Sequence, residues 1–144
     1  MTKVFVDADV ILDLFIDREP HHSVAMRFFS YADANAASIA LYTSPVVIAN
    51  VAYLLGRAKS HAYAVDRLAR LRQFVGVLPM GESVIDDAIR RPGGEFEDSL
   101  QYHCARANEL TVIITRNVKD FITDSVQIMT PSEFLTVDFM EKST

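Results

Sequence analysis

The sequence predicts an α/β fold in three layers, in which helices cover both faces of a central parallel sheet of about four strands. Short β-rich runs alternate with amphipathic helical segments along the chain, an order typical of strands joined by crossover helices. The run at residues 111–114 is β-branched and apolar, as expected for a strand buried on both faces. Proline and glycine fall between these segments, where turns are required.

The N-terminal half begins with a strand and continues mainly as helices. The expected elements are, in order, a strand at residues 3–6, a helix at about 20–34, a short strand allowed at 41–42, a helix through about residue 57, and another helix after Ser60. Ser44 is an N-cap residue, and Pro45 occupies the first helical position after it. Ser60 is a second N-cap candidate.

The C-terminal half repeats the alternation. The expected elements are a strand at residues 74–78, a helix at 82–90, a breaker at 91–94, a helix at 95–108 and strands at 111–114 and 126–129. The inner face of the 95–108 helix is expected to carry Phe96, Leu100, His103, Cys104 and Ala107. A terminal helix follows the capping box that runs from Thr130 to Glu133.

Composition indicates one globular domain over residues 1–144. Half of the residues are hydrophobic, and no apolar run is long enough to cross a bilayer or resembles a signal peptide, so we expect a cytoplasmic protein without a membrane partner. The single cysteine, Cys104, excludes an internal disulfide and a cysteine-rich zinc site. A net charge of −5 argues against nucleic-acid binding through bulk positive charge. It leaves open an acidic site that meets phosphates through metal ions.

Acidic and amide side chains follow the ends of predicted strands. Asp7 ends the first strand, Asp98 lies in the first turn of the 95–108 helix, and Asn117 and Asp120 follow the 111–114 strand. In a parallel sheet these regions can all reach the carboxyl edge. Because converging carboxylates repel one another, and hard cations with oxygen ligands relieve that repulsion, the pattern predicts a Mg²⁺ or Mn²⁺ site suited to phosphate chemistry.

These motifs together resemble the PIN domain in order and spacing. They are Val-Asp7-Ala-Asp9-Val, then Phe96-Glu97-Asp98, then Thr115-Arg116-Asn117-Val-Lys-Asp120, and the resemblance extends over essentially the whole chain. It implies the three-layer α/β/α PIN fold. Many PIN domains are Mg²⁺- or Mn²⁺-dependent ribonucleases, including toxins of VapBC-type toxin–antitoxin pairs. The resemblance thus implies that Asp7 and Asp98 bind metal, and that a metal-activated water attacks the RNA phosphodiester in line, leaving a 3′-hydroxyl and a 5′-phosphate.

Two positions depart from the family pattern. PIN nucleases usually carry a glutamate where Asn50 stands and often an aspartate where Asn117 stands. Asparagine offers a carbonyl oxygen without charge, so the cation site is expected to be weaker, with Asp9 and Asp120 compensating in part. The predicted site has catalytic Asp7, Asp98 and Asp120; metal ligands Asp7, Asp98, Asn117 and Asp120; supporting Asp9, Asn50 and Thr115; and Arg116 on the substrate phosphate.

Each of these residues also has a purely structural interpretation. Asp7 is a suitable cap for the helix that follows it, and Asp98 complements the dipole of its own helix. Asn117 and Asp120 are equally suited to a turn. Asp13 and Asp17 are expected at the surface.

The sequence is compatible with three functions. The first is a metal-dependent ribonuclease, the toxin of a toxin–antitoxin pair. Its partners would be RNA, an antitoxin protein and a second copy of the chain, with the apolar helices between residues 44 and 72 as the protein-binding surface. The second is a catalytically weakened or inactive PIN module that binds RNA or a protein partner. The third is a phosphatase of the haloacid dehalogenase kind, because Asp7 and Asp9 match its nucleophile motif, but the downstream lysine and acidic pair occur in the wrong order.

Overall fold

The computed structural model describes residues 1–121 and 124–143, with the side chains of residues 139, 140, 142 and 143 left aside. The elements in chain order are β1 (Thr2–Val6), α1 (Ala8–Phe15), α2 (His21–Ala34), β2 (Ile39–Thr43), α3 (Pro45–Ala58), α4 (His61–Leu71), β3 (Val75–Val77), α5 (Glu82–Arg90), α6 (Phe96–Ala107), β4 (Val112–Ile114), a 3₁₀ turn (Val118–Asp120), β5 (Gln127–Met129) and α7 (Pro131–Ser143).

The described residues form one parallel sheet of five strands in the order β3-β2-β1-β4-β5. The expected class of fold is therefore confirmed, but the count of about four strands is one too low. The additional strand is β2, which pairs with β1 from Thr2↔Ile39 to Phe5↔Tyr42. Its alternating burial makes a half-buried strand longer than the two residues allowed from the sequence.

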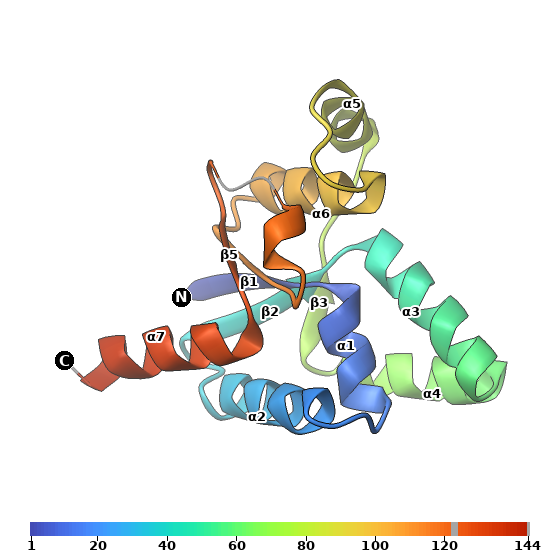
Figure 1. Cartoon of the computed structure of the whole chain (residues 1–144), viewed down its shortest axis with the longest axis vertical. Helices are drawn as coiled ribbons and strands as arrows, with labels where there is room; N and C mark the ends of the chain where they lie inside the picture. The colour runs from blue at the N-terminus through green and yellow to red at the C-terminus, as the bar shows by residue number, and fades with distance from the viewer. Residues whose placement is uncertain (122–123, 144) are drawn as a thin grey trace.

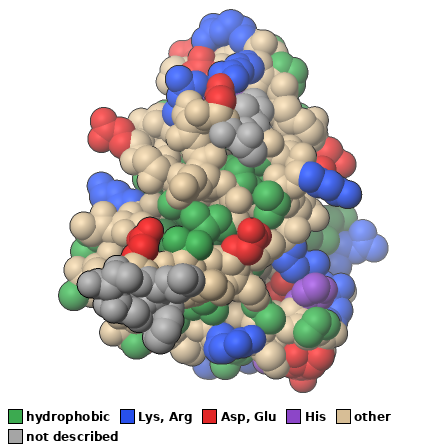
Figure 2. Space-filling model, turned by 60° about the vertical axis from the view of Figure 1, so that its left-hand side comes forward, with side chains coloured by type: hydrophobic (Ala, Val, Ile, Leu, Met, Phe, Trp, Pro, Cys, Tyr) green, Lys and Arg blue, Asp and Glu red, His purple; other side chains and the backbone are tan. Residues whose placement is uncertain are grey.

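Helices cover both faces of this sheet, which gives three layers. In Figure 1, α5 and α6 lie above the sheet, and α1, α2 and α7 lie below it. Both ends of the chain lie at the left of that view. Figure 2 brings this left side forward and shows a group of hydrophobic side chains near its middle, with charged side chains of both signs around them. Within the described ranges, no helix is both long and apolar enough to span a membrane.

The predicted helix starts are confirmed by their hydrogen bonds. The hydroxyls of Ser44 and Ser60 accept the backbone N–H groups of Val47 and Tyr63, and Thr130 and Glu133 form the reciprocal bonds of a capping box.

The predicted inner face of α6 is wrong at both ends, because Phe96 and Ala107 are exposed. Burial instead covers the continuous stretch from Ser99 to Ala105. This helix packs against β4 and also against α5, so its middle is covered from more than one side.

The order of the strands creates a crevice at the carboxyl edge of the sheet. From β1 the chain crosses to β2 on one side, whereas β4 pairs with β1 on the other side. Connections leave in opposite directions at such a switch point and open a crevice where ligands of α/β proteins commonly bind. Asp7 directly follows β1 and Thr115 directly follows β4, so both stand at this crevice.

Candidate metal centre

Asp7 is fixed at the crevice by two hydrogen bonds. Its Oδ1 accepts the backbone N–H of Ala8 at 2.8 Å, and its Oδ2 accepts the hydroxyl of Thr115 at 3.0 Å. It is the N-cap residue of α1 and is only 8% exposed. The capping interpretation and the position at the predicted site therefore both hold for the same side chain.

Burial, together with the nearby negative charge of Asp9, raises the pKa of Asp7 to about 7. Burial makes the larger contribution. The bonds from Ala8 and Thr115 oppose the shift, because they stabilise the ionised form. The Thr115 hydroxyl lies 3.0 Å from Asp7 and 3.3 Å from Asp9, and it has a single proton to share between the two carboxylates. Asp7 and Asp9 therefore compete for one hydroxyl proton as a hydrogen-bond donor.

Asp9 carries an oxygen without a partner. Its Oδ2 accepts the backbone N–H of Arg116 at 2.9 Å and the hydroxyl of Thr115 at 3.3 Å. Its Oδ1 is buried and, although the nearby backbone N–H of Val10 lowers the pKa of Asp9, this oxygen accepts no hydrogen bond of standard geometry among the described residues. Burial raises the pKa of Asp9 as well. A buried carboxylate oxygen without a donor costs free energy, which a bound cation would recover.

Asp98 reaches the same region from the first turn of α6. Its Oδ2 accepts the backbone N–H of Glu95 at 3.2 Å, so it also caps the helix to which it belongs. Partial burial raises its pKa, and the neighbouring charges of Asp120 and Glu95 act in the same direction.

Gly94 brings Asp98 and Asp120 together. Its φ of +67° lies in the region that favours glycine, and a Cβ placed there would lie 2.2 Å from the backbone oxygen of Asp120. The same Cβ would lie 3.2 Å from Oδ2 of Asp98. A glycine therefore lets the loop before α6 pack directly against the turn that carries Asp120.

The carboxylates of Asp7, Asp9, Asp98 and Asp120 line one cleft of about 500 Å³, here called the acidic cleft. Its polar lining includes the six acids Asp7, Asp9, Glu95, Glu97, Asp98 and Asp120 and the asparagines Asn50 and Asn117. No lysine, arginine or histidine lies among the described residues that line it. Glu95 and Glu97 were not among the predicted site residues, although Glu97 is part of the Phe-Glu-Asp motif that identified Asp98.

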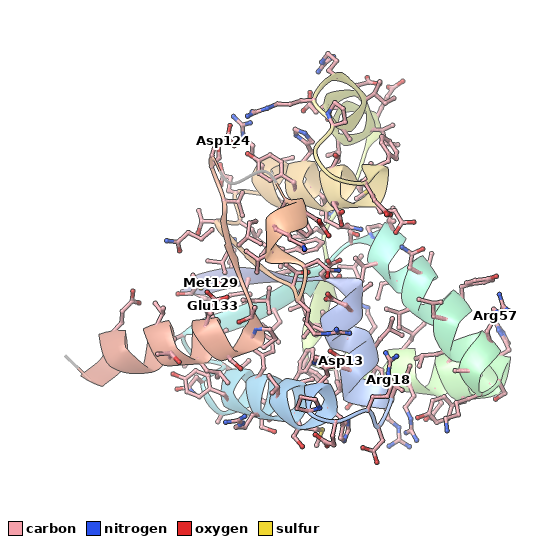
Figure 3. The ribbon with its side chains drawn as sticks, viewed as in Figure 1. Asp13, Arg18, Arg57, Asp124, Met129 and Glu133 are labelled. Atoms are coloured by element: carbon pink, nitrogen blue, oxygen red, sulfur yellow. The ribbon has the colours of Figure 1, made fainter. Side chains whose placement is uncertain are left out.

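Arg116, the predicted substrate contact, is engaged elsewhere. Its Nε and Nη2 donate to the two carboxylate oxygens of Asp13, at 2.7 and 3.2 Å, and it lines a neighbouring pocket instead of the acidic cleft. The expectation that Asp13 lies at the surface is wrong, because Asp13 is 2% exposed on the inner side of α1 (Figure 3). Burial of this carboxylate is balanced by its bidentate partner. A contact between Arg116 and substrate stays a prediction.

The acidic cleft has the donor chemistry of a hard divalent cation site. In the part of the chain that the structure describes, no three Asp, Glu, His or Cys side chains already stand as a complete metal site. Mg²⁺ commonly takes only one or two protein carboxylates and keeps several waters, so a complete protein cage is not required. Six acids without a lining base, together with the unpartnered Oδ1 of Asp9, fit such an ion.

The arrangement that a haloacid dehalogenase would need is not assembled. Asp124 is bonded to Tyr102 and Arg91, and it does not line the acidic cleft. In Figure 3 it lies at the upper left, across the molecule from α3. Lys119 is likewise absent from the described lining of the cleft.

Fold and cleft together define a three-layer α/β/α protein with a cluster of carboxylates at the carboxyl edge of a parallel sheet. The family model of the PIN domain matches residues 3–119. This chain belongs to the PIN domain family, as its motifs indicated.

Comparison with curated proteins and solved structures agrees with this family. The chain is 28% identical over 137 residues to ribonuclease VapC1 of Aquifex aeolicus (strain VF5), covering 92% of each protein. Its fold is similar to that of Mycobacterium tuberculosis VapC20, a toxin that cleaves the sarcin–ricin loop, with a TM-score of 0.61, 22% identity and coverage of 76% of this chain and 86% of that one. It is also similar to VapBC-1 of nontypeable Haemophilus influenzae, with a TM-score of 0.66, 20% identity and coverage of 91% and 99%.

Proposed function

We propose that this protein is a divalent-metal-dependent endoribonuclease and the toxin of a toxin–antitoxin pair. The observation that carries the proposal is the acidic cleft at the switch point of the sheet, with its buried, unpartnered carboxylate oxygen on Asp9. Membership of the PIN family and the similarity to ribonuclease VapC1 support the same activity.

Asp7, Asp98, Asp120 and the amide oxygen of Asn117 are the proposed ligands of Mg²⁺ or Mn²⁺. When bound, the ion supplies Lewis acidity and lowers the pKa of the water that attacks phosphorus. Thr115 holds the carboxylate of Asp7 in place, and Gly94 holds Asp98 next to the turn of Asp120. Because the described lining contains no basic side chain, an RNA phosphate is admitted to this cleft only when a cation offsets the carboxylates.

RNA cleavage by the purified protein tests this activity. With Mn²⁺, the protein should cut RNA, and chelation by EDTA should abolish the cleavage. Asp7→Asn and Asp98→Asn should each lower the rate by about 100-fold or more, because each removes a negative charge from the cation site. Asp17→Asn is the matched control, since Asp17 is exposed just after α1 and outside the cleft. Cleavage that survives EDTA or Asp98→Asn would contradict the proposal.

An antitoxin and a second copy of the chain are the proposed protein partners. VapBC complexes among the similar structures support an antitoxin partner. On this chain, α3 exposes Tyr53 (61%) and Leu54 (44%), and α4 exposes Val65 (51%), which are apolar side chains suited to such contacts. Light scattering of the isolated chain would report a homodimer. Co-purification with the product of the adjacent gene would report the antitoxin.

A PIN module without catalytic activity, binding RNA or a protein, is the second candidate. The neutral Asn50 and Asn117, and the lack of a ready-made three-ligand group among the described residues, favour it. Protein that binds RNA equally with and without Mn²⁺, and cuts none of it, would select this candidate.

A further inference from the structure

Glu97 reaches the acidic cleft through a bond to Asn50. The Nδ2 group of Asn50, on α3, donates to Oε2 of Glu97, on α6, at 3.1 Å. The two residues lie 47 positions apart in the chain and both line the cleft. The bond therefore joins the two helices at the position where the usual PIN glutamate is missing.

The bond explains why Glu97 and Asp98 share one cleft. Consecutive residues on a helix point in different directions, so their positions on α6 alone would not bring both carboxylates to the same place. The long glutamate side chain can turn back, and the Asn50 amide provides a fixed donor toward which it turns.

The neutral amide at position 50 is what allows this arrangement. A carboxylate on Asn50's position would face the Glu97 carboxylate across a hydrogen-bond distance and repel it. With asparagine there, the negative charge that α3 lacks is present on α6. The acidic cleft therefore has no glutamate at position 50 on α3, but it has Glu97 on α6.

We infer that Glu97 is an additional cation ligand of the acidic cleft, and that Asn50 is a positioning residue that orients it. This inference rests on the proposed metal-dependent function. The Asn50 amide occupies one acceptor site on Oε2 of Glu97, which leaves the remaining lone pairs of this carboxylate for an ion. The site then regains through Glu97 one of the two charges that the asparagines remove.

Calorimetric titration of the whole, metal-free protein with Mn²⁺ tests the inference. Glu97→Gln should raise the Kd for Mn²⁺ about tenfold, because it removes a ligand charge. Asn50→Ala should raise it roughly threefold, because the carboxylate remains but is no longer oriented. Glu82→Gln is the matched control: Glu82 is also an exposed acid in the first turn of a helix, α5, but lies outside the cleft. It should leave the Kd unchanged.

A reciprocal exchange separates ligation from a structural effect. In the double variant Asn50→Glu with Glu97→Gln, the glutamine can donate to the new glutamate, so the bond is kept with its polarity reversed and the charge moves to α3. The Kd should return to within roughly threefold of that of the unmodified protein. Melting curves without metal should show all variants folded, since the bond lies at the surface.

The results distinguish failure of the inference from failure of the proposed function. If Glu97→Gln leaves the Kd unchanged while Asp98→Asn weakens Mn²⁺ binding, the inference is overturned and the metal site stands. If the double variant binds Mn²⁺ no more tightly than Glu97→Gln, the inference that a carboxylate of the 50–97 pair binds the ion is also overturned. If the unmodified protein binds no Mn²⁺, the inference and the proposed metal dependence fall together.

Discussion

At the scale of single residues, the ion pair of Asp13 and Arg116 lies in the pocket next to the acidic cleft. The Asp13 side chain is 3% exposed, whereas that of Arg116 is 32% exposed. The backbone N–H of Arg116 also holds Asp9. The pair thus links α1 to the segment after β4, on which the positions of Asp9 and Thr115 depend.

Removing the two partners should have unequal effects on stability. Arg116→Met leaves a buried carboxylate without its counter-ion and should lower the free energy of unfolding by about 3–5 kcal/mol. Asp13→Asn leaves a guanidinium that water can reach, so the loss should be smaller, about 1–2 kcal/mol. Urea denaturation measures both values. A larger loss for Asp13→Asn than for Arg116→Met would show that the pair is not controlled by the burial of Asp13.

Sequence reasoning reached the acids that follow strand ends but not those whose role depends on distant contacts. The positions of Asp7, Asp98 and Asp120 in the cleft follow from the rule that parallel strands meet at one edge. Asp13 was misplaced because its partner lies 103 residues away. Glu97 was missed because its hydrogen-bond partner in the cleft, Asn50, lies on another helix 47 residues away.

At the scale of helices and strands, Ser44 forms a second hydrogen bond that the N-cap motif does not predict. As an N-cap it accepts the N–H of Val47, and its hydroxyl donates to Oε1 of Gln101 at 2.6 Å. Ser44 and Gln101 are both buried, and Gln101 also lines the cleft. This bond joins α3 to α6, the two helices that carry Asn50 and Glu97.

Replacing each N-cap serine by alanine should separate capping from this link. Ser60→Ala removes an exposed cap and should cost about 1 kcal/mol of unfolding free energy. Ser44→Ala removes a cap and also leaves the buried Gln101 without its donor, so the cost should be about 2–4 kcal/mol. Urea denaturation of the two variants measures the difference. Equal losses would mean that Gln101 finds another donor.

Patterns of apolar residues and caps predicted the starts of α2 to α7, because such signals are local, whereas α1 was expected only as a helix that Asp7 could cap. They underestimated the sheet, because β2 is recognisable mainly by its pairing with β1. They also misplaced the inner face of α6, whose burial depends on packing against both β4 and α5.

At the scale of the whole molecule, the cleft links folding stability to pH. Asp7 has a pKa of about 7 in the folded protein against 3.8 for the unperturbed group, and the pKa values of Asp9 and Asp98 are also raised. Between about pH 4 and pH 7 the folded state therefore binds more protons than the unfolded state. Without metal, the free energy of unfolding should be highest at the acidic end of this window and fall as the pH rises to about 7. Melting temperatures in EDTA at pH 5 and pH 8 should show this decrease.

Asp7→Asn should remove most of that dependence, because asparagine keeps the volume without a charge to desolvate. Its Oδ1 can still accept the Ala8 N–H, and its Nδ2 can donate to the Thr115 hydroxyl in place of the bond that the carboxylate accepted. It should also be more stable than the unmodified protein at pH 8 in EDTA, by about 1–3 kcal/mol. Asp17→Asn, at an exposed position, should leave the pH dependence as it is. Mn²⁺ should act in the opposite sense to protons, because the ion requires the ionised carboxylates, so the rise in melting temperature on adding Mn²⁺ should be larger at pH 8 than at pH 6. A metal-free protein that becomes more stable from pH 5 to pH 8 would mean that the cleft's carboxylates are not held at a cost in the folded state, and the argument for a cation that relieves this cost would fail with it.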